Sequence, residues 1–333
     1  MKKILIFFIL LSLLSIVYLN FHESNKSQIV FNLERTYKPL KKKNVIKLNF
    51  SGYYFKNYND TISIYDFTNK KIKLISNVNG KVLKEIGKAG DAPTEFNHPY
   101  YFQIIKDTIY YLDVGKNSIT KMDKNGKLLH FYKGDNKLNH SILINSNSFL
   151  VTRNSDKGFL EFGNLNILNK KFDKFDKVTN IFPKKKYNYW IYDGFLQTDS
   201  NYLYYITSFS NQIIKFSIDD DIVYNKNLIH KTPLLVLKEI DNMIIPSKNS
   251  NPSVLDVKIN NNIIYVLSNV SDKKERYAKN KHRVIDLYDT KNGQYISSFK
   301  LENFDNEAVP YEIDVHGNKI STIYETKIVN YEY

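Results

Sequence analysis

Histidine and carboxylate side chains are the residues of this 333-residue chain that could bind a metal or transfer protons. The seven histidines are His22, His98, His130, His140, His230, His282 and His316. A histidine-built metal site needs several of them at equivalent positions of neighbouring structural elements. They stand at different places relative to the strand pattern described below, which argues against such a site. His98 is the best single candidate, and bonding to a neighbouring loop is its simpler role.

Other catalytic chemistry finds little support in the sequence. The absence of cysteine excludes disulfides, thiolate nucleophiles and Cys-ligated zinc or iron–sulfur clusters. Nucleophile-elbow, zinc-protease, phosphate-loop and dinucleotide motifs are also missing from the sequence. We therefore predict no catalytic residues and no metal ligands. The net charge of +14 is spread along the chain, so we predict no nucleic-acid partner.

Short alternating segments separated by Asn, Asp and Gly recur along the chain. Residues 107–131 contain three of them, and Asn125-Gly126 is the strongest hairpin signal. The pattern returns at residues 61–86, 201–216, 262–299 and 318–331, and a weaker copy occupies residues 142–162. One such sheet cannot bury both of its faces, so the units must stack round an axis. Six units predict an all-β fold, a six-bladed β-propeller.

The two ends of the repeat region predict how the ring closes. The last unit ends at Tyr333 with its third strand, while Asn44–Phe50 has the pattern of a strand without a sheet. We expect residues 44–50 to form the outer strand of the last blade, which would join the ends of the repeat region and leave only short edges.

The N-terminus resembles an export signal, because Lys2 and Lys3 precede an apolar run from Ile4 to Leu19. Residues 17–22 lack the small residues that signal peptidase prefers, which favours an uncleaved signal anchor over a cleaved signal peptide. The expected organisation is a signal anchor or signal peptide at 1–22, a polar basic stalk at 23–43 and the propeller at 44–333. Such a protein would be single-pass in the inner membrane with its propeller in the periplasm, or secreted to the periplasm if the signal is cleaved.

The segment Gly87-Lys-Ala-Gly-Asp-Ala-Pro-Thr-Glu-Phe-Asn-His-Pro99 leads into a strand at Tyr100. It resembles the blade-linking pattern of six-bladed propellers of bacterial envelope proteins, akin to NHL-repeat and TolB-like propellers. The matching residues are Gly87, Gly90, Pro93, Glu95, Phe96 and Pro99. The resemblance covers roughly residues 45–333 and implies a fold and an envelope location, but no reaction. Many members are lipoproteins, whereas this chain lacks the anchoring cysteine.

Residues at the starts of inner strands would face the mouth of the central funnel. The candidates are His98, Tyr100, Tyr101, Tyr311 and Glu312, whose side chains suit a small polar ligand or a peptide segment. We favour a non-catalytic binding or scaffold propeller for an envelope protein, peptide or glycan, without a cofactor. The alternative is a metal-dependent hydrolase or lyase, similar to gluconolactonases or amidating lyases, with calcium or zinc on the axis.

Overall fold

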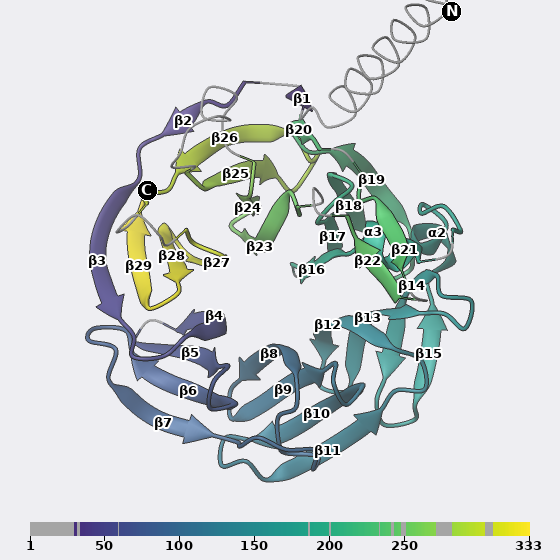
Figure 1. Ribbon diagram of the computed structural model, residues 1–333, viewed down its shortest axis with the longest axis horizontal. Coiled ribbons are helices and arrows are strands. Elements are labelled where there is room, and N and C mark those ends of the chain that lie inside the picture. Colours follow the sequence, from purple (N-terminus) through teal and green to yellow (C-terminus); the bar gives the residue numbers. More distant parts are fainter. Residues whose placement is uncertain are drawn as a thin grey trace, which may run out of the picture.

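Alternating apolar and polar residues, broken by turns at Asn, Asp and Gly, form short antiparallel strands in a computed structural model of the chain (Figure 1). The structure describes residues 30–31, 34–58, 60–185, 187–199, 201–232, 234–240, 243–247, 251–270, 282–303 and 309–333. These residues form six blades round a central axis, each with four antiparallel strands. The predicted six-bladed β-propeller is thus confirmed.

The first three blades follow one another along the chain. Blade 1 contains β4 (Gly52–Tyr58), β5 (Thr61–Asp66), β6 (Lys71–Ser76) and β7 (Val82–Ile86). Blade 2 contains β8 (Pro99–Ile105), β9 (Thr108–Asp113), β10 (Ser118–Asp123) and β11 (Leu128–Lys133). Blade 3, the weak copy in the sequence, contains β12 (Leu138–Asn145), β13 (Ser148–Asn154), β14 (Leu160–Asn166) and β15 (Lys171–Lys174).

The other three blades complete the ring. Blade 4 contains β16 (Gly194–Thr198), β17 (Leu203–Thr207), β18 (Gln212–Phe216) and β19 (Ile222–Asn227). Blade 5 contains β23 (Val254–Asn260), β24 (Ile263–Ser268), β25 (Val284–Asp289) and β26 (Tyr295–Lys300). Blade 6 contains β27 (Glu312–His316), β28 (Lys319–Tyr324), β29 (Lys327–Glu332) and β3 (Lys41–Lys47). In every blade the first strand after the connection lies nearest the axis (Figure 1).

Few other elements occur in the described residues. The helices α2 (Asp176–Thr179) and α3 (Asn188–Ile191) connect blades 3 and 4, and β21 (Leu237–Ile240) pairs with β22 (Met243–Pro246). The expected membrane segment Ile4–Leu19 lies outside the described residues. Within the described residues, no helix has the length and apolar character needed to cross a bilayer.

Apolar side chains hold the blades together at their interfaces. Six buried clusters occur among the described residues, and each combines residues from two neighbouring blades. Between blades 3 and 4, for example, the Phe162 and Tyr205 rings meet edge to face with centroids 4.8 Å apart. Burial between blades therefore supplies the core that a single sheet lacks.

The ring closes as the sequence predicts. Strand β3 pairs with β29 antiparallel, from Lys327 opposite Lys47 to Glu332 opposite Lys41. The strand begins at Lys41 rather than Asn44 and ends at Lys47 rather than Phe50. Ile46 points into the cluster between blades 6 and 1 and is 1% exposed. Hydrogen bonding and apolar packing thus join the two ends of the repeat region.

The expected stalk at residues 23–43 differs in its described part, which packs on the propeller. Strand β1 (Val30–Phe31) pairs with β20 (His230–Lys231), and β2 (Tyr37–Lys38) pairs in parallel with β26 at the outer edge of blade 5. Between them, Arg35 forms two 2.8 Å bonds with the carboxylate of Asp286, and both side chains are fully buried. Arg35 belongs to a basic segment that the sequence suggests is solvated, but its side chain is buried in an ion pair with Asp286.

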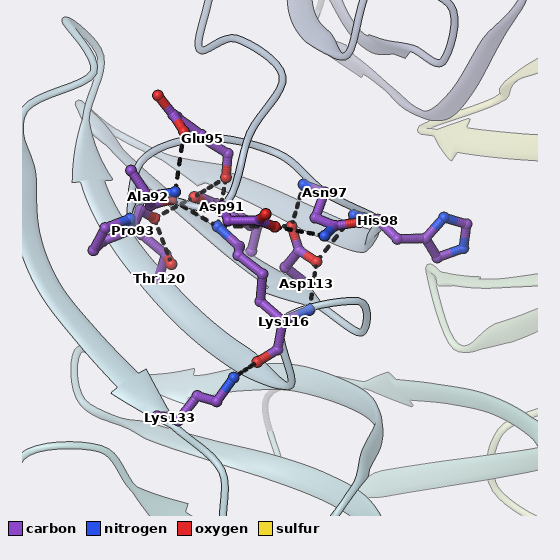
Figure 2. Close-up of polar contacts among 11 residues, drawn as sticks. Asp91, Ala92, Pro93, Glu95, Asn97, His98, Asp113, Lys116, Thr120 and Lys133 are labelled. Carbon is purple, nitrogen blue, oxygen red and sulfur yellow. Dashed lines mark hydrogen bonds and ion pairs between the residues drawn. The ribbon is translucent and has the colours of Figure 1, made fainter.

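The segment from Gly87 to Pro99, which resembles a blade-linking motif, connects β7 to β8. Figure 2 shows the polar contacts of its central residues. Gly87 has a φ of +78°, and a Cβ there would lie 2.3 Å from the Phe96 ring, which is fully buried between Tyr65 and Tyr111. Glu95 accepts a hydrogen bond from the Ala92 N–H at 3.0 Å. The tight turn is what allows the Phe96 ring to fill the interface between blades 1 and 2.

Side chains of blade 2 hold this linker in place. The hydroxyl of Tyr111 donates to Pro93 O at 2.7 Å, and the Lys116 ammonium donates to Ala92 O at 3.0 Å. Asp113 accepts from the backbone N–H groups of Asn97 and His98 at 2.8 and 3.0 Å. Pro99, the last residue of the motif, begins β8. The motif residues therefore have a structural role in setting where the inner strand starts.

Two neighbouring residues of β3 test the closure. Ile46→Ala should lower the free energy of unfolding by about 2–4 kcal/mol, since it removes a buried side chain at the closing interface. Val45→Ala is the matched control, because Val45 is 42% exposed and its change should stay within about 0.5 kcal/mol. Urea unfolding followed by circular dichroism measures both. Equal effects of the two substitutions would contradict this account of closure.

Candidate functional site

A cavity of about 510 Å³ lies on the propeller axis. All six inner strands line it, and its lining runs from the beginnings of these strands, at Tyr53 and Tyr100, to their ends, at Tyr58 and Ile105. Small-molecule sites in proteins typically occupy about 300–1,000 Å³. The cavity is therefore large enough for a small organic ligand.

The two halves of the cavity wall differ in character. The lysine and carboxylate side chains of the described lining all come from blades 1, 5 and 6, and they are Lys56, Asp256, Lys258 and Glu312. Blades 2, 3 and 4 contribute aromatic, apolar and uncharged polar side chains, among them Tyr100, Tyr101, Phe102, Ile104, Ile142, Phe195 and Leu196. The site is thus polarised across the axis, with a charged wall opposite a mainly apolar one.

Asp256 and Lys258 form an ion pair within the charged wall. The Lys258 ammonium lies 2.8 Å from each Asp256 oxygen, and Asp256 also accepts the Ile313 N–H at 2.9 Å. Burial acts to lower the pKa of Lys258, but the Asp256 carboxylate outweighs it and raises this pKa overall. The ammonium is therefore charged at neutral pH, and its charge is balanced locally.

Glu312 differs from Asp256, because the salt bridges of the described residues give it no cationic partner within 4 Å. Its Oε2 accepts the Phe55 N–H at 3.2 Å. Burial and the nearby Asp256 carboxylate raise its pKa from 4.5 to about 8, against opposing effects of Lys258 and of the backbone N–H groups of Tyr54 and Phe55. The carboxyl is therefore mostly protonated at pH 7.

An aromatic arc begins beside Glu312 and follows the starts of the inner strands. It consists of Tyr311, Tyr53, Tyr54, Tyr100 and His140, all of which line the cavity. Successive ring centroids are 5.1, 6.3, 5.7 and 5.0 Å apart. The far end of the arc is anchored by Asp193, whose carboxylate lies 2.6 Å from His140 Nε2.

Tyr54 has an unusual backbone conformation within this arc. Its φ is +55°, and the register of β4 against β5 shifts between Tyr53 and Lys56, which marks a β-bulge. A left-handed conformation is uncommon for a tyrosine and is tolerated when the surroundings impose it. Bulges often redirect a side chain beside a functional site. Here the bulge brings the Tyr54 ring to Tyr100 and the Phe55 N–H to Glu312.

The structure separates the five predicted funnel residues. Tyr100, Tyr101, Tyr311 and Glu312 all line the axial cavity. His98 is exposed and does not belong to the described lining; its ring meets Phe67 edge to face at 6.2 Å. Figure 2 shows the imidazole pointing away from the polar contacts of the linker. The four lining residues are therefore brought together, and whether they bind a ligand stays a prediction.

Sequence reasoning missed the lining residues of the other blades, although a positional signal was present. Tyr54, Tyr101, Asp256 and Glu312 each stand eight residues before an isoleucine of the next strand, at Ile62, Ile109, Ile264 and Ile320. The offset marks the inner strand of blade 1, which has no proline at its start, but blades 3 and 4 have neither the proline nor an isoleucine at the equivalent position.

Metal binding was the alternative for the axis. Within the described residues, no group of three or more His, Asp and Glu side chains is arranged to hold a metal ion. Two carboxylates of the linker, Asp91 and Glu95, fix its turn, because Asp91 accepts a hydrogen bond from the Asn97 side-chain amide at 2.6 Å and Glu95 accepts one from the Ala92 N–H.

Fold and cavity define the class of protein as a six-bladed β-propeller with an axial cavity. No protein-family profile and no curated protein sequence matches the chain. A solved member of the DUF4221 family from Bacteroides vulgatus is similar, with a TM-score of 0.57 and 11% identity over 90% of this chain and 98% of that one.

Two further solved propellers resemble the chain. The propeller domain of Cps50 (Swd1) from Myceliophteria thermophila has a TM-score of 0.53 and 9% identity, covering 89% of this chain and 100% of that domain. A catalytically inactive virginiamycin B lyase from Staphylococcus aureus, solved with quinupristin, has a TM-score of 0.50 and 15% identity. The match covers 89% of this chain and 99% of that one. Identities this low show a shared fold alone.

The pKa of Glu312 predicts how Glu312→Gln changes stability. Between pH 4.5 and about 8 the folded state holds a proton that the unfolded state has released. This group's contribution to stability is therefore complete below pH 4.5 and lost as the pH rises through 8. Glu312→Gln should leave the free energy of unfolding nearly unchanged at pH 4.5. At pH 9 it should raise that free energy by on the order of a few kcal/mol.

Urea unfolding of both proteins at the two pH values measures this difference. Glu325→Gln, at an exposed position, is the matched control and should show no such pH dependence. If Glu312→Gln changed stability equally at both pH values, the raised pKa would be refuted.

Proposed function

We propose that this protein is a non-catalytic binding propeller of the cell envelope that holds a ligand in its axial cavity. The observation that carries the proposal is the polarised wall, with Asp256, Lys258 and Glu312 facing apolar residues such as Ile104 and Leu196. A wall of this kind suits an amphipathic ligand, whose apolar part and polar head need opposite surroundings. The ligand is a small molecule or a side chain of a bound peptide.

The fold leaves the choice between binding and catalysis open, since propellers support both. Binding is favoured by the way the polar side chains of the charged wall are used. Asp256 is held by Lys258 and by the Ile313 N–H, and Lys56 of the wall pairs at 2.9 Å with Asp314, which also accepts a hydrogen bond from the Asn57 N–H at 2.7 Å. Groups that are paired in this way give a fixed surface for recognition.

The envelope location is supported by the sequence of the N-terminus. Two lysines followed by the apolar run Ile4–Leu19 form an export signal, and the positive charges favour a cytoplasmic start. The propeller would then face the periplasm and meet ligands or partners there.

An environment-sensitive probe tests the cavity. The neutral dye N-phenyl-1-naphthylamine should bind purified propeller saturably, with one site and a rise in fluorescence. Gln197→Trp, which fills part of the lining from β16, should weaken binding at least fivefold. Gln294→Trp is the control, because Gln294 is exposed in the turn between β25 and β26. Absence of saturable binding, or equal binding by both folded variants, would refute a cavity that takes apolar ligands.

A reporter fusion tests the location. Alkaline phosphatase joined after Tyr333 should be active in bacteria, because it folds only after export, and green fluorescent protein at the same site should be dark. Deleting residues 4–19 should reverse both results. Activity of the phosphatase fusion without residues 4–19 would contradict the export signal. Sedimentation with membranes or release as soluble protein then distinguishes an anchor from a cleaved signal.

A further inference from the structure

The aromatic arc and the carboxyl beside it have a chemistry that goes beyond general amphipathic binding. Aromatic faces attract cations, and several rings combined with a carboxylate are a recurring arrangement for recognising organic ammonium groups. Here Tyr311, Tyr53, Tyr54 and Tyr100 stand in series round the side of the cavity where Glu312 lies. The ligand class inferred from this chemistry rests on the proposed binding function.

Acidic side chains from three blades surround this part of the cavity. Burial is the main cause of the raised pKa of the Tyr100 hydroxyl, and the nearby Asp193, Tyr54, Asp256 and Glu312 add to it. Burial disfavours any charge, so only the part of this effect that comes from the nearby carboxyl groups would also favour a cation. The chain as a whole carries a net charge of +14, so this cluster of acidic side chains is a local feature.

The cations near these carboxylates are already engaged. Lys258 is paired with Asp256, and Lys56 lies 2.9 Å from Asp314. Glu312 has a different position, since its described contacts are backbone N–H groups and its neighbours include the carboxylate of Asp256. When a ligand cation binds beside Glu312, the carboxyl group would lose its proton and form an ion pair with that cation.

The Tyr54 bulge is an independent observation that points to the same place. A tyrosine held at a φ of +55° stores backbone strain, which persists where the surroundings impose it and is concentrated at ligand sites. The same bulge supplies the N–H groups that hold the Glu312 carboxyl. Ring and carboxyl are therefore positioned by one local feature.

We propose that the axial cavity binds an organic ammonium group, with Glu312 as its counter-ion and the rings of Tyr53, Tyr54, Tyr100 and Tyr311 as its cage. The apolar wall at Ile104, Ile142 and Phe195 takes the hydrocarbon attached to it. The ligand class is an alkylammonium compound, which occurs either as a small amphiphilic amine or as the lysine side chain of a peptide.

Displacement of the naphthylamine dye by three amphiphiles with the same ten-carbon chain tests the proposal. At pH 9 and below micelle-forming concentrations, decyltrimethylammonium should bind wild-type propeller at least tenfold more tightly than decanol or decyl sulfate. Glu312→Gln should reduce that preference to less than threefold while dye binding is kept. Glu302→Gln, an exposed carboxylate paired with Lys42, is the matched control and should keep the preference.

The arc is tested by removing one ring. Tyr100→Leu should weaken decyltrimethylammonium binding about tenfold, whereas Tyr100→Phe, which keeps the ring, should restore it. Tyr58→Leu removes a tyrosine from the other end of the cavity lining and should have little effect. Equal losses for Tyr100→Leu and Tyr58→Leu would refute the cage.

Binding should also release a proton near neutral pH, because the cation stabilises ionised Glu312. Isothermal titration of decyltrimethylammonium at pH 7 in two buffers of different ionisation enthalpy detects this release, and Glu312→Gln should abolish it.

Binding of acetyl-Leu-Lys-Leu-amide, compared with binding of its norleucine counterpart, distinguishes a peptide lysine from a small amine as the source of the ammonium group. Dye binding without any preference for cations would overturn this inference and leave the proposed function standing; loss of dye binding would overturn both.

Discussion

The pairing of β3 with β29 is the constraint on which the rest of this structure depends. A four-stranded blade buries its faces only against two neighbours, and blades 1 and 6 become neighbours only when the ends of the repeat region meet. The contact joins residues very distant in sequence, such as Asn44 and Asn330, which are 286 positions apart and share a 3.0 Å hydrogen bond. Because the cavity wall consists of all six inner strands, the site exists only in the closed ring.

Two carboxyl groups that line the axial cavity, those of Asp256 and Glu312, have both a structural and an electrostatic role. Asp256 accepts a hydrogen bond from a backbone N–H of blade 6, and Glu312 accepts one from blade 1, so these carboxyl groups link the inner strands of blades 5, 6 and 1. The same side chains define the charged wall of the cavity. Asp256 is balanced by Lys258, whereas Glu312 retains its proton because burial and Asp256 disfavour its charge. Blade-to-blade geometry and cavity chemistry therefore rest on shared residues.

Local sequence rules anticipated much of the fold. The Asn-Gly turns at 79–80, 125–126 and 292–293 lie between the third and fourth strands of blades 1, 2 and 5, and Pro99 begins an inner strand, as turn and strand chemistry predict. The closing strand was found because it lacked a sheet of its own. The attachment of residues 34–43 was not found, since a buried Arg35 in a basic segment cannot be distinguished from a solvated one without its partner Asp286.

By itself, the sequence determined the strands, their turns and the count of six units, because alternation and turn propensity act over a few neighbouring residues. It also placed Tyr100, Tyr101, Tyr311 and Glu312 near the starts of inner strands. Only the tertiary structure decided which of these side chains meet: that Tyr54 bulges toward Tyr100, that His98 turns away from the lining, and that among the described residues Lys258 pairs with Asp256 while Glu312 accepts a backbone N–H. Distances across the axis are set by ring closure, and burial and Coulomb interactions depend on those distances rather than on spacing along the chain.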